Sequence, residues 1–432
     1  METACGESAA PSVDCGGVLP PDPTRQRAIV SGSKAVILLV FVCSAAVFVA
    51  TRSLDLLQGT DFPDFYCAAR MLVDGHGHQL YNAEVQRQYQ ARYAGRVGTL
   101  YIHPPFEAVL YLAVAWLPLR RAYLLWSLLN MAFLALGARR LAKEALVPWD
   151  WRVLLAASLT FAPLLLCLQQ GQDSLLLLLL VILAFTALRR DRAFAAGCWL
   201  GLGLFKFQIV LPLLLVLIFT QRSARSELVK GCGLVGLALA GLSAAISGWS
   251  VFSAYPTFLV HLRAQPFAGI VPQAMANFRG LTYFFFQRDQ SLGAVVVVSI
   301  LSAAALVATL TGWSESRVSA QLRPAVRTPS QFDLAFSGTV LFALLVSYHL
   351  NPHDLTLLLL PMVVMLRHSV PASSSHWLML GLCAVLFLPP LHLFALQAHA
   401  YALLSIPLIA LFAVSASWVR KEDREAGAAR IR

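Results

Sequence analysis

Charged residues are scarce in this chain. They make up 13% of its 432 residues, whereas 58% are hydrophobic, and the mean hydropathy is +0.68. Soluble domains are typically about 45 to 50% apolar, so the composition excludes an ordinary soluble domain. Several apolar runs reach the roughly 20 residues that a helix needs to cross a bilayer. We therefore expect a polytopic membrane protein.

Several other features are missing from the sequence. The apolar runs lack the alternation of polar and apolar residues found in barrel strands, which predicts an all-α helical bundle. The eight cysteines are scattered over the predicted spans, the N-terminal tail and one loop, so no disulfide framework or zinc site is indicated. No Gly-rich phosphate loop is present. No internal repeat is visible, which weighs against transporters built from two related halves.

The net charge of +11 comes from short Lys and Arg clusters placed between the apolar runs. This placement is typical of membrane topology and does not predict a nucleic-acid partner. The positive-inside rule puts residues 1–33, a Gly-, Pro- and Ser-rich segment that we expect to be disordered, in the cytoplasm. Residues 34–419 then form a single transmembrane domain, and 420–432 form a basic cytoplasmic tail.

About twelve transmembrane helices are predicted. They lie near residues 35–51, 105–119, 122–138, 153–169, 174–188, 196–219, 229–247, 291–311, 333–349, 355–367, 376–394 and 400–418. This count places two long loops, 52–104 and 248–290, outside the cytoplasm, and both are expected to contain short helices. The count leaves two basic clusters, 139–143 and 189–192, on the outer face against the charge rule. The number of spans between 120 and 200 therefore stays open.

Two acids, Asp61 and Asp64, follow the first predicted span within the first outer loop. A carboxylate beside an acceptor hydroxyl can take its proton as a general base. The alternative is that either acid caps a helix, and Asp64 fits that role well because it precedes an apolar helical pattern. His103 ends the same loop before Pro104 and Pro105, where its imidazole could contact a phosphate or an acceptor, or have no partner at all.

Three further groups of polar residues interrupt or join the predicted spans. Lys206 lies inside the apolar run 195–220, where a charge is costly unless it faces an anion or a cavity; the alternative is snorkelling to the interface. His349 and His353 are spaced i, i+4, but Pro352 between them breaks the helix that a metal pair would need, so substrate contact is favoured over metal. Gln172 belongs to a polar turn between two apolar runs, which is either a simple turn or a contact inside the bundle.

Short motifs in a fixed order carry a family resemblance. They are Asp61-Phe62 with Phe65-Tyr66 and Ala68-Ala69, Gly75, Leu80-Tyr81, His103-Pro104-Pro105, Leu117-Pro118, Leu125-Trp126, Asn130, Gly171-Gln172, the stretch from Ala196-Gly197 to Lys206, and His353. With this order the chain resembles the GT-C superfamily of membrane glycosyltransferases. It is most similar to the polyprenyl-phosphate-mannose-dependent α-mannosyltransferases of glycosyltransferase family 87.

The resemblance implies a multi-span GT-C fold with an active site on the outer face of the bacterial plasma membrane. It also implies a polyprenyl-phosphate sugar as donor, and an aspartate in the first outer loop as the general base of an inverting transfer. Asp61 matches that aspartate by position. Two features depart from the family pattern: His103 stands where an aromatic residue is expected, and Asp64 adds a second acid.

The sequence therefore predicts a hexosyltransferase, with mannose as the first candidate sugar, acting on a lipid or glycan acceptor. Asp61 is the expected base and Asp64 the second candidate. Lys206, His349 and His353 are expected at the donor phosphate, where cations would stabilise the leaving charge. Further candidates for donor or substrate contact are His103, Gln172, Arg263 and Arg279. No cofactor is expected, and the need for a metal stays open. The rival hypotheses are a transporter of a small solute or lipid, and an envelope scaffold whose acids are structural.

Overall fold

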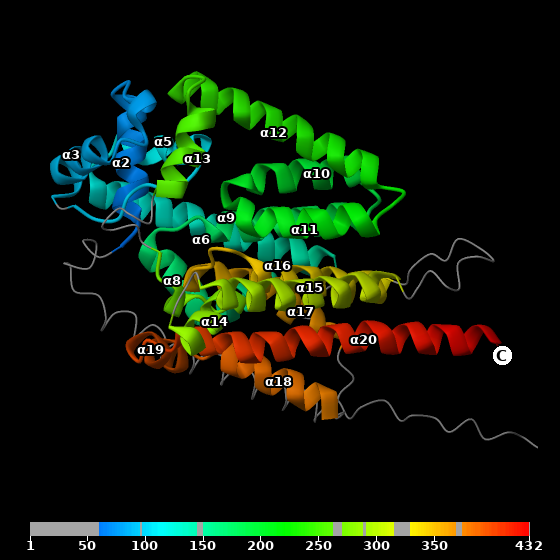
Figure 1. Ribbon diagram of the computed structural model, residues 1–432. Helices are drawn as coiled ribbons and strands as arrows, with labels where there is room; N and C mark the ends of the chain where they lie inside the picture. Colours follow the sequence, from blue (N-terminus) through cyan, green and yellow to red (C-terminus); the bar gives the residue numbers. More distant parts are fainter. Residues whose placement is uncertain are drawn as a thin grey trace, which may run out of the picture.

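The computed structural model in Figure 1 describes residues 60–95, 97–144, 150–261, 270–287, 291–314, 329–368 and 374–431. Within these ranges every regular element is a helix, so the prediction of an all-α protein is confirmed. The predicted tail 1–33 and the first predicted span, 35–51, lie outside the described residues.

The α-helices are α2 (Phe62–Val73), α3 (Ala83–Ala94), α4 (Pro105–Ala108), α5 (Leu112–Ala115), α6 (Leu119–Lys143), α7 (Trp151–Ser158), α8 (Ala162–Gln170), α9 (Ser174–Leu188), α10 (Ala193–Leu202), α11 (Phe207–Thr220), α12 (Arg225–Ser247), α13 (Val251–His261), α14 (Phe278–Phe286), α15 (Leu292–Ser314), α16 (Pro329–Val346), α17 (Leu359–His368), α18 (Ser374–Phe387), α19 (Pro389–Gln397) and α20 (Ser405–Ile431). The short 3₁₀ helices are η2 (Gly77–Gln79), η3 (Val109–Tyr111), η4 (Gly203–Lys206), η6 (Pro272–Ala274), η8 (Pro352–Leu358) and η9 (Tyr401–Leu404).

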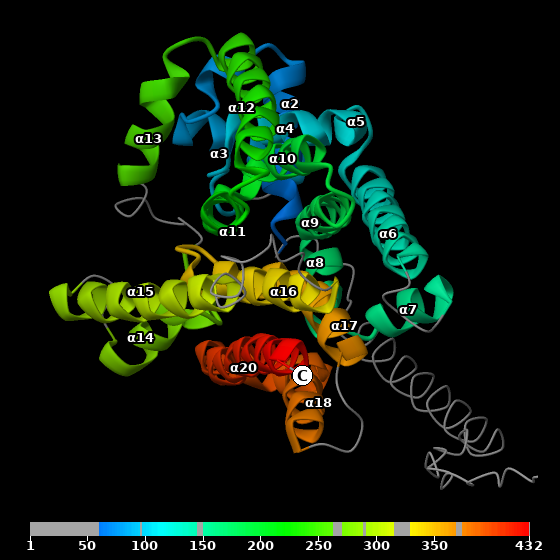
Figure 2. The same cartoon turned by 90° about the vertical axis from the view of Figure 1, so that its right-hand side faces the viewer.

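The long helices are stacked in three tiers, as Figures 1 and 2 show. Helices α9 to α12 form the first tier, α15 and α16 the second, and α18 and α20 the third. Contacts of α11 with α15 and α16, and of α16 with α20, join the tiers. One apolar core runs through all three, because each helix turns buried Leu, Val and Phe side chains toward its neighbours.

By length and composition, five helical stretches could cross a membrane, with α10, η4 and α11 counted as one stretch, or up to seven if two bent pairs each count as one span. The bent pairs are α7 with α8, at 74°, and α18 with α19, at 57°. Several large apolar side chains on these helices face outward, including Leu237 on α12, Leu292 and Ile300 on α15, and Phe394 on α19. These helices indicate a membrane protein, whereas the predicted count of about twelve spans is not confirmed.

The predicted span 196–219 is divided in the structure into α10, η4 and α11. A Cβ on Gly197 would lie 2.2 Å from the Leu228 carbonyl oxygen, and one on Gly231 would lie 2.1 Å from that of Phe194. The starts of α10 and α12 therefore pack backbone to backbone, as small residues allow between membrane helices. Since α11 connects these two helices, the chain must reverse at η4. Lys206, the last residue of η4, thus lies at this reversal and not in the middle of one long helix.

The two long predicted loops contain short helices, as expected: α2, η2 and α3 in the first, and α13, η6 and α14 in the second. Figure 1 shows these elements at the same end of the tiers, opposite the C-terminus. A second apolar core holds the first group together. Its centre is the stacked pair of Phe65 on α2 and Tyr111 in η3, whose rings lie 4.7 Å apart. This core fixes the position of the chain at Asp61, directly before α2.

Candidate active site

Lys206 forms the centre of a buried ionic cluster. Its ammonium lies 2.7 Å from Oδ1 of Asp354 and 3.3 Å from Oδ1 of Asp173, and it donates to Oε1 of Gln172 at 3.4 Å. Its side chain is only 3% exposed. Because an ammonium has three N–H groups, these three acceptors use its donors fully. Lys206 is thus positioned to hold the two acids and Gln172 in place, and its direct contact with a donor phosphate stays a prediction.

Asp354 lies in the first turn of η8, and both oxygen atoms of its carboxylate accept hydrogen bonds. Ser174 donates its hydroxyl to Oδ1 at 2.8 Å, and the Asn351 backbone N–H donates to Oδ2 at 2.9 Å. Burial alone would raise the pKa of the Asp354 carboxyl, but the Lys206 ammonium and these hydrogen bonds outweigh it and hold the pKa well below its usual range. Asp354 is therefore ionised and pairs with Lys206.

Gln172 connects this cluster to Asp61. Its Nε2 donates to Oδ2 of Asp61 at 2.7 Å, while its Oε1 accepts from Lys206. The Asp61 backbone N–H donates in turn to Oε1 of Gln170 at 3.0 Å. The polar turn after α8 thus positions the residue that precedes α2, more than 100 residues away in the chain. The two Gln172 bonds also fix the orientation of its amide, because each end has only one suitable partner.

Asp64 lies in a different environment. Its Oδ1 accepts a hydrogen bond from Nε2 of Gln90 at 2.9 Å, and its Oδ2 accepts one from the Thr99 hydroxyl. Asp64 therefore connects α2 to α3 and to the segment that follows α3. The side chain is buried. The expectation that Asp64 caps a helix is wrong: α2 begins at Phe62 after Asp61, and Asp64 lies inside its first turn. The bonds to Gln90 and Thr99 indicate a structural role.

Glu107, on α4, forms a second link to the cluster. Its carboxyl is fully buried and close enough to that of Asp173 for each to shift the pKa of the other. Two carboxyl groups this close in a buried site do not both ionise readily. Burial accordingly raises the pKa of Asp173 to about 7, although Lys206 opposes the shift and Glu107 adds to it. The other neighbour of Glu107 is His103, whose Nδ1 lies 3.0 Å from Oε1.

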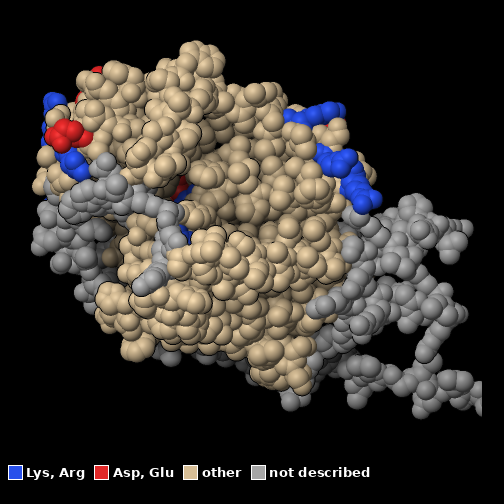
Figure 3. All heavy atoms as spheres, in the orientation of Figure 1, with Lys and Arg blue, Asp and Glu red and all other residues tan. Residues whose placement is uncertain are grey.

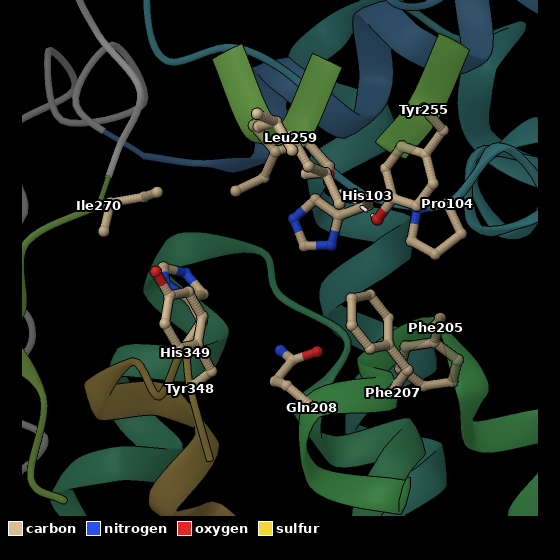
Figure 4. A pocket seen from close by; sticks show the side chains of 12 residues that line it. His103, Pro104, Phe205, Phe207, Gln208, Tyr255, Leu259, Ile270, Tyr348 and His349 are labelled. Atoms are coloured by element: carbon tan, nitrogen blue, oxygen red, sulfur yellow. Dashed lines mark hydrogen bonds between the residues drawn. The ribbon is translucent and has the colours of Figure 1, made fainter. Parts of the chain in front are cut away.

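His103 and His349 face a pocket of about 430 Å³ beside the cluster. Figure 4 shows the two imidazoles pointing into it from opposite sides, with Gln208 entering from α11 and Tyr255 from α13. The remaining lining residues are mostly apolar: Ile102, Pro104, Phe205, Phe207, Leu259, Val260, Ile270 and Tyr348. Figure 3 shows a hollow next to α13 with acidic and basic atoms visible at its base. An apolar pocket with a few converging polar groups is the usual form of a ligand site.

The imidazoles of this region are neutral near pH 7. Burial lowers the pKa of His103 and of His349 to about 4, although the Asp354 carboxylate opposes both shifts. The carboxylates of Asp61 and Asp173 also act on the His103 ring, which places the pocket wall within electrostatic reach of the cluster. Burial lowers the pKa of His353 further, to about 3, and its Nε2 lies 3.7 Å from Asp354.

Arg279, on α14, lies at the edge of this region and is engaged with Tyr348. It donates to the Tyr348 carbonyl at 2.8 Å, and its guanidinium lies 4.1 Å from the centre of the Tyr348 ring. Since Tyr348 lines the pocket, Arg279 shapes the wall. Arg263 lies outside the described residues.

A family model described as glycosyltransferase family 87 matches residues 101–347, which is more than half of the chain. The chain belongs to glycosyltransferase family 87. The family of glycosyltransferases suspected from the sequence motifs is thereby confirmed. Searches of curated proteins and of solved structures gave no match.

The part of the chain that matches family 87 contains His103, Gln172, Lys206 and Arg279, whereas Asp61, His349 and His353 lie outside it. The structure nevertheless brings Asp61 to Gln172 and His353 to Asp354. Sequence reasoning did not select Glu107, Asp173 or Asp354 as site residues. An isolated charge within an apolar run, the signal that identified Lys206, would also have found Glu107.

Proposed function

We propose that this glycosyltransferase is an integral membrane hexosyltransferase that takes its sugar, with mannose as the first candidate, from a polyprenyl-phosphate carrier. The acceptor is a lipid or glycan on the extracytoplasmic side of the bacterial plasma membrane. One observation carries the proposal: the carboxylate of Asp61 is held by Gln172, which Lys206 binds in turn, and it acts on His103 in the wall of an apolar pocket, in a chain with several apolar helices.

The reaction needs few groups from the protein. The acceptor hydroxyl attacks the anomeric carbon, and Asp61 takes its proton as general base. The bond between this carbon and the phosphate oxygen breaks, its electron pair leaves with the polyprenyl phosphate, and the configuration at the anomeric carbon inverts. The hydrogen bond from Gln172 orients the Asp61 carboxylate.

The pocket suits a donor of mixed character. Its apolar residues fit the first isoprene units of the carrier, and the carrier already holds an activated sugar, so the proposal includes no resident cofactor. When the carrier leaves, the negative charge on its phosphate increases. Hydrogen-bond donors near the phosphate would stabilise this charge. Gln208, His103 and His349 are the polar groups in reach of such a phosphate in the pocket. Lys206 does not line the pocket but binds Gln172, Asp173 and Asp354 beside it.

The orientation is supported by the distribution of charge. On the face shown in Figure 3, the end of the bundle where α12 begins carries Lys and Arg side chains without visible acids, whereas the other end carries basic and acidic side chains together. Basic residues favour the cytoplasmic side. The pocket and the Asp61 cluster would then face outward, because Figure 1 places α2 and α13 at the other end.

The test is transfer by the purified chain reconstituted in phospholipid vesicles. We expect it to move radiolabel from polyprenyl-phosphate hexoses to a lipid or glycan extracted from the host envelope, with the mannose donor most active. A transporter would instead move a labelled solute across the vesicle membrane without cleaving any donor. That outcome, with all donors intact, would overturn the proposal.

A further inference from the structure

A second pocket, of about 610 Å³, lies on the other side of α13 from the first. Helix α13 separates the two pockets. Its residues Tyr255, Leu259 and Val260 line the first pocket, and residues on another face of the helix line the second. The lining residues are His78, Gln79, Tyr81 and Asn82 from η2 and the turn after it, Ser247 and Ser250 from the end of α12, and Val251, Ser253, Ala254, Thr257, Phe258 and His261 from α13. The sequence analysis and the proposed reaction make no use of this pocket.

The lining of the second pocket is polar without formal charge. Nine of its twelve lining side chains carry a hydroxyl, amide or imidazole group, and none of the described lining residues is Asp, Glu, Lys or Arg. Such groups both donate and accept hydrogen bonds, which matches the hydroxyls of a neutral sugar and not an anion. The rings of Tyr81 and Phe258, 5.3 Å apart, supply an apolar surface on which the C–H face of a sugar ring can pack.

Two groups in this pocket have unused hydrogen-bonding capacity. Ser247 is 4% exposed, and its Oγ has no hydrogen-bond partner among the described residues. Buried hydroxyls are normally bonded, so this one is suited to a ligand. Nδ1 of His261 lies 2.8 Å from the Thr257 carbonyl, which can only accept, so Nδ1 carries a hydrogen, and Nε2 has no hydrogen-bond partner among the described residues.

The two pockets share a wall of aromatic rings. Tyr81, which lines the second pocket, stacks on Tyr255, which lines the first, with their ring centres 5.0 Å apart. The Tyr81 hydroxyl also donates to the His103 carbonyl at 2.8 Å. A chain of sugar units in the second pocket would therefore begin beside the first pocket, only one side-chain layer away.

We propose that the second pocket binds neutral saccharide units of the acceptor, which holds a growing glycan beside the sugar-transfer site. This inference rests on the proposed glycosyl transfer in one respect: the bound saccharide is identified as part of the acceptor. The binding of a neutral saccharide can be measured without any donor.

The experiment uses the full-length protein in phospholipid nanodiscs and saturation-transfer NMR. The probes are neutral trisaccharides of mannose, glucose and galactose, with trigalacturonic acid as the charged comparison. At least one neutral trisaccharide should bind and the charged one should not. Thr257→Trp, which fills the pocket from α13, should abolish the signal. Absence of binding by all three neutral probes would overturn the proposal.

A matched pair of variants on α12 locates the binding. Ser243 is also 4% exposed, but its hydroxyl is satisfied by the Leu239 carbonyl at 2.9 Å. Ser247→Ala should weaken saccharide binding at least threefold while the protein keeps its thermal stability, whereas Ser243→Ala should bind like the wild type. Equal binding by all variants would place the ligand elsewhere and refute the proposal.

A transfer assay separates this inference from the proposed function. Ser247→Ala should raise KM for the acceptor at least threefold and leave kcat and the donor KM unchanged. If saccharides bind as described but no donor is ever cleaved, the proposed transfer fails and the saccharide site stands. If transfer proceeds and the acceptor KM does not change, the saccharide site fails alone.

Discussion

Oδ1 of Asp354 lies 2.7 Å from the Lys206 ammonium, although 148 residues separate the two in the chain. Both side chains are almost completely buried. This ion pair fastens η8 to the reversal of the chain between α10 and α11. Through Gln172 the same ammonium is connected to Asp61, so the geometry of the candidate base depends on the pair.

Lys206→Met should destabilise the protein strongly, because it leaves the ionised Asp354 buried without its cation. Breaking a buried ion pair typically costs about 3–5 kcal/mol. Thermal unfolding in detergent should show this loss, and Asp354→Asn should recover part of it when combined with Lys206→Met. The control is Lys230→Met on α12, whose exposed pair with Glu227 should contribute little. Equal unfolding temperatures for both lysine variants would contradict the ionic role of Lys206.

Gly231→Ala should separate α10 from α12, because its Cβ would meet the Phe194 carbonyl oxygen at 2.1 Å. Overpacking of this kind typically costs about 1–3 kcal/mol, and a backbone atom cannot move aside as a side chain can. Gly233→Ala, two residues along α12, has open space around its Cβ and serves as the control. Thermal unfolding should show a clear loss for the first variant and none for the second. A stable Gly231→Ala protein would show that these helices are not in close contact.

Much of the candidate site could be predicted because its residues interrupt apolar runs. Lys206 and Gln172 stood out in this way, and the structure joins them. Their partners could not be predicted, since pairing Lys206 in η4 with Asp354 in η8 depends on long-range packing between parts of the chain 148 residues apart. Asp173 directly follows Gln172 in the sequence, where nothing marks it as a partner of Lys206. The sequence suggests a helix cap for Asp64, because its hydrogen-bond partners, Gln90 and Thr99, lie 26 and 35 residues further along the chain.

The fold was predicted in class but not in detail. Hydropathy detects the length and composition of a run, so α9 and the short helices of both long loops were found. It does not detect a change of direction inside a run. The 74° bend between α7 and α8 and the reversal at η4 therefore appear only in the structure.

Acid should destabilise the protein partly through His353. Its folded pKa, about 3, lies below the value of about 6.5 for an unfolded histidine, so the unfolded state binds more protons between these values. The contribution of His353 to stability is thus present above about pH 6.5 and is lost as the pH falls toward 3. His353→Gln, which cannot titrate, should reduce the fall in unfolding temperature between pH 7 and pH 5.

The exposed His78 provides the comparison for this measurement. His78→Gln should unfold with the wild-type dependence on pH, because the side chain is exposed. An identical pH dependence in the His353→Gln protein would show that this imidazole is not buried in its neutral form.

Gln172→Leu should keep the fold and reduce sugar transfer about tenfold or more, since Asp61 would lose its hydrogen bond to the amide that Lys206 binds. Hydrogen bonds to charged groups contribute about 1.5–3 kcal/mol. The control is Gln169→Leu, in the last turn of α8, where the Tyr123 hydroxyl donates to the backbone carbonyl and this bond survives the substitution. The rate of transfer at saturating donor distinguishes the two. Similar rates for Gln172→Leu and wild type would remove Gln172 from the site.

Asp61 and Asp64 differ in what they contact, and so they should differ in what their loss does. Asp61→Asn retains an oxygen atom for the Gln172 bond and should fold like the wild type. Asp64→Asn weakens the bonds from Gln90 and Thr99, so it should lower the unfolding temperature while the remaining folded protein transfers sugar.

The rate of sugar transfer from a polyprenyl-phosphate donor by the Asp61→Asn protein is the most direct test of Asp61 as the base. Loss of a general base typically reduces a rate about 10²- to 10⁴-fold. We predict a loss of this size in a protein whose unfolding temperature equals that of the wild type. Wild-type transfer by Asp61→Asn, together with complete loss in a well-folded Asp64→Asn protein, would contradict the account.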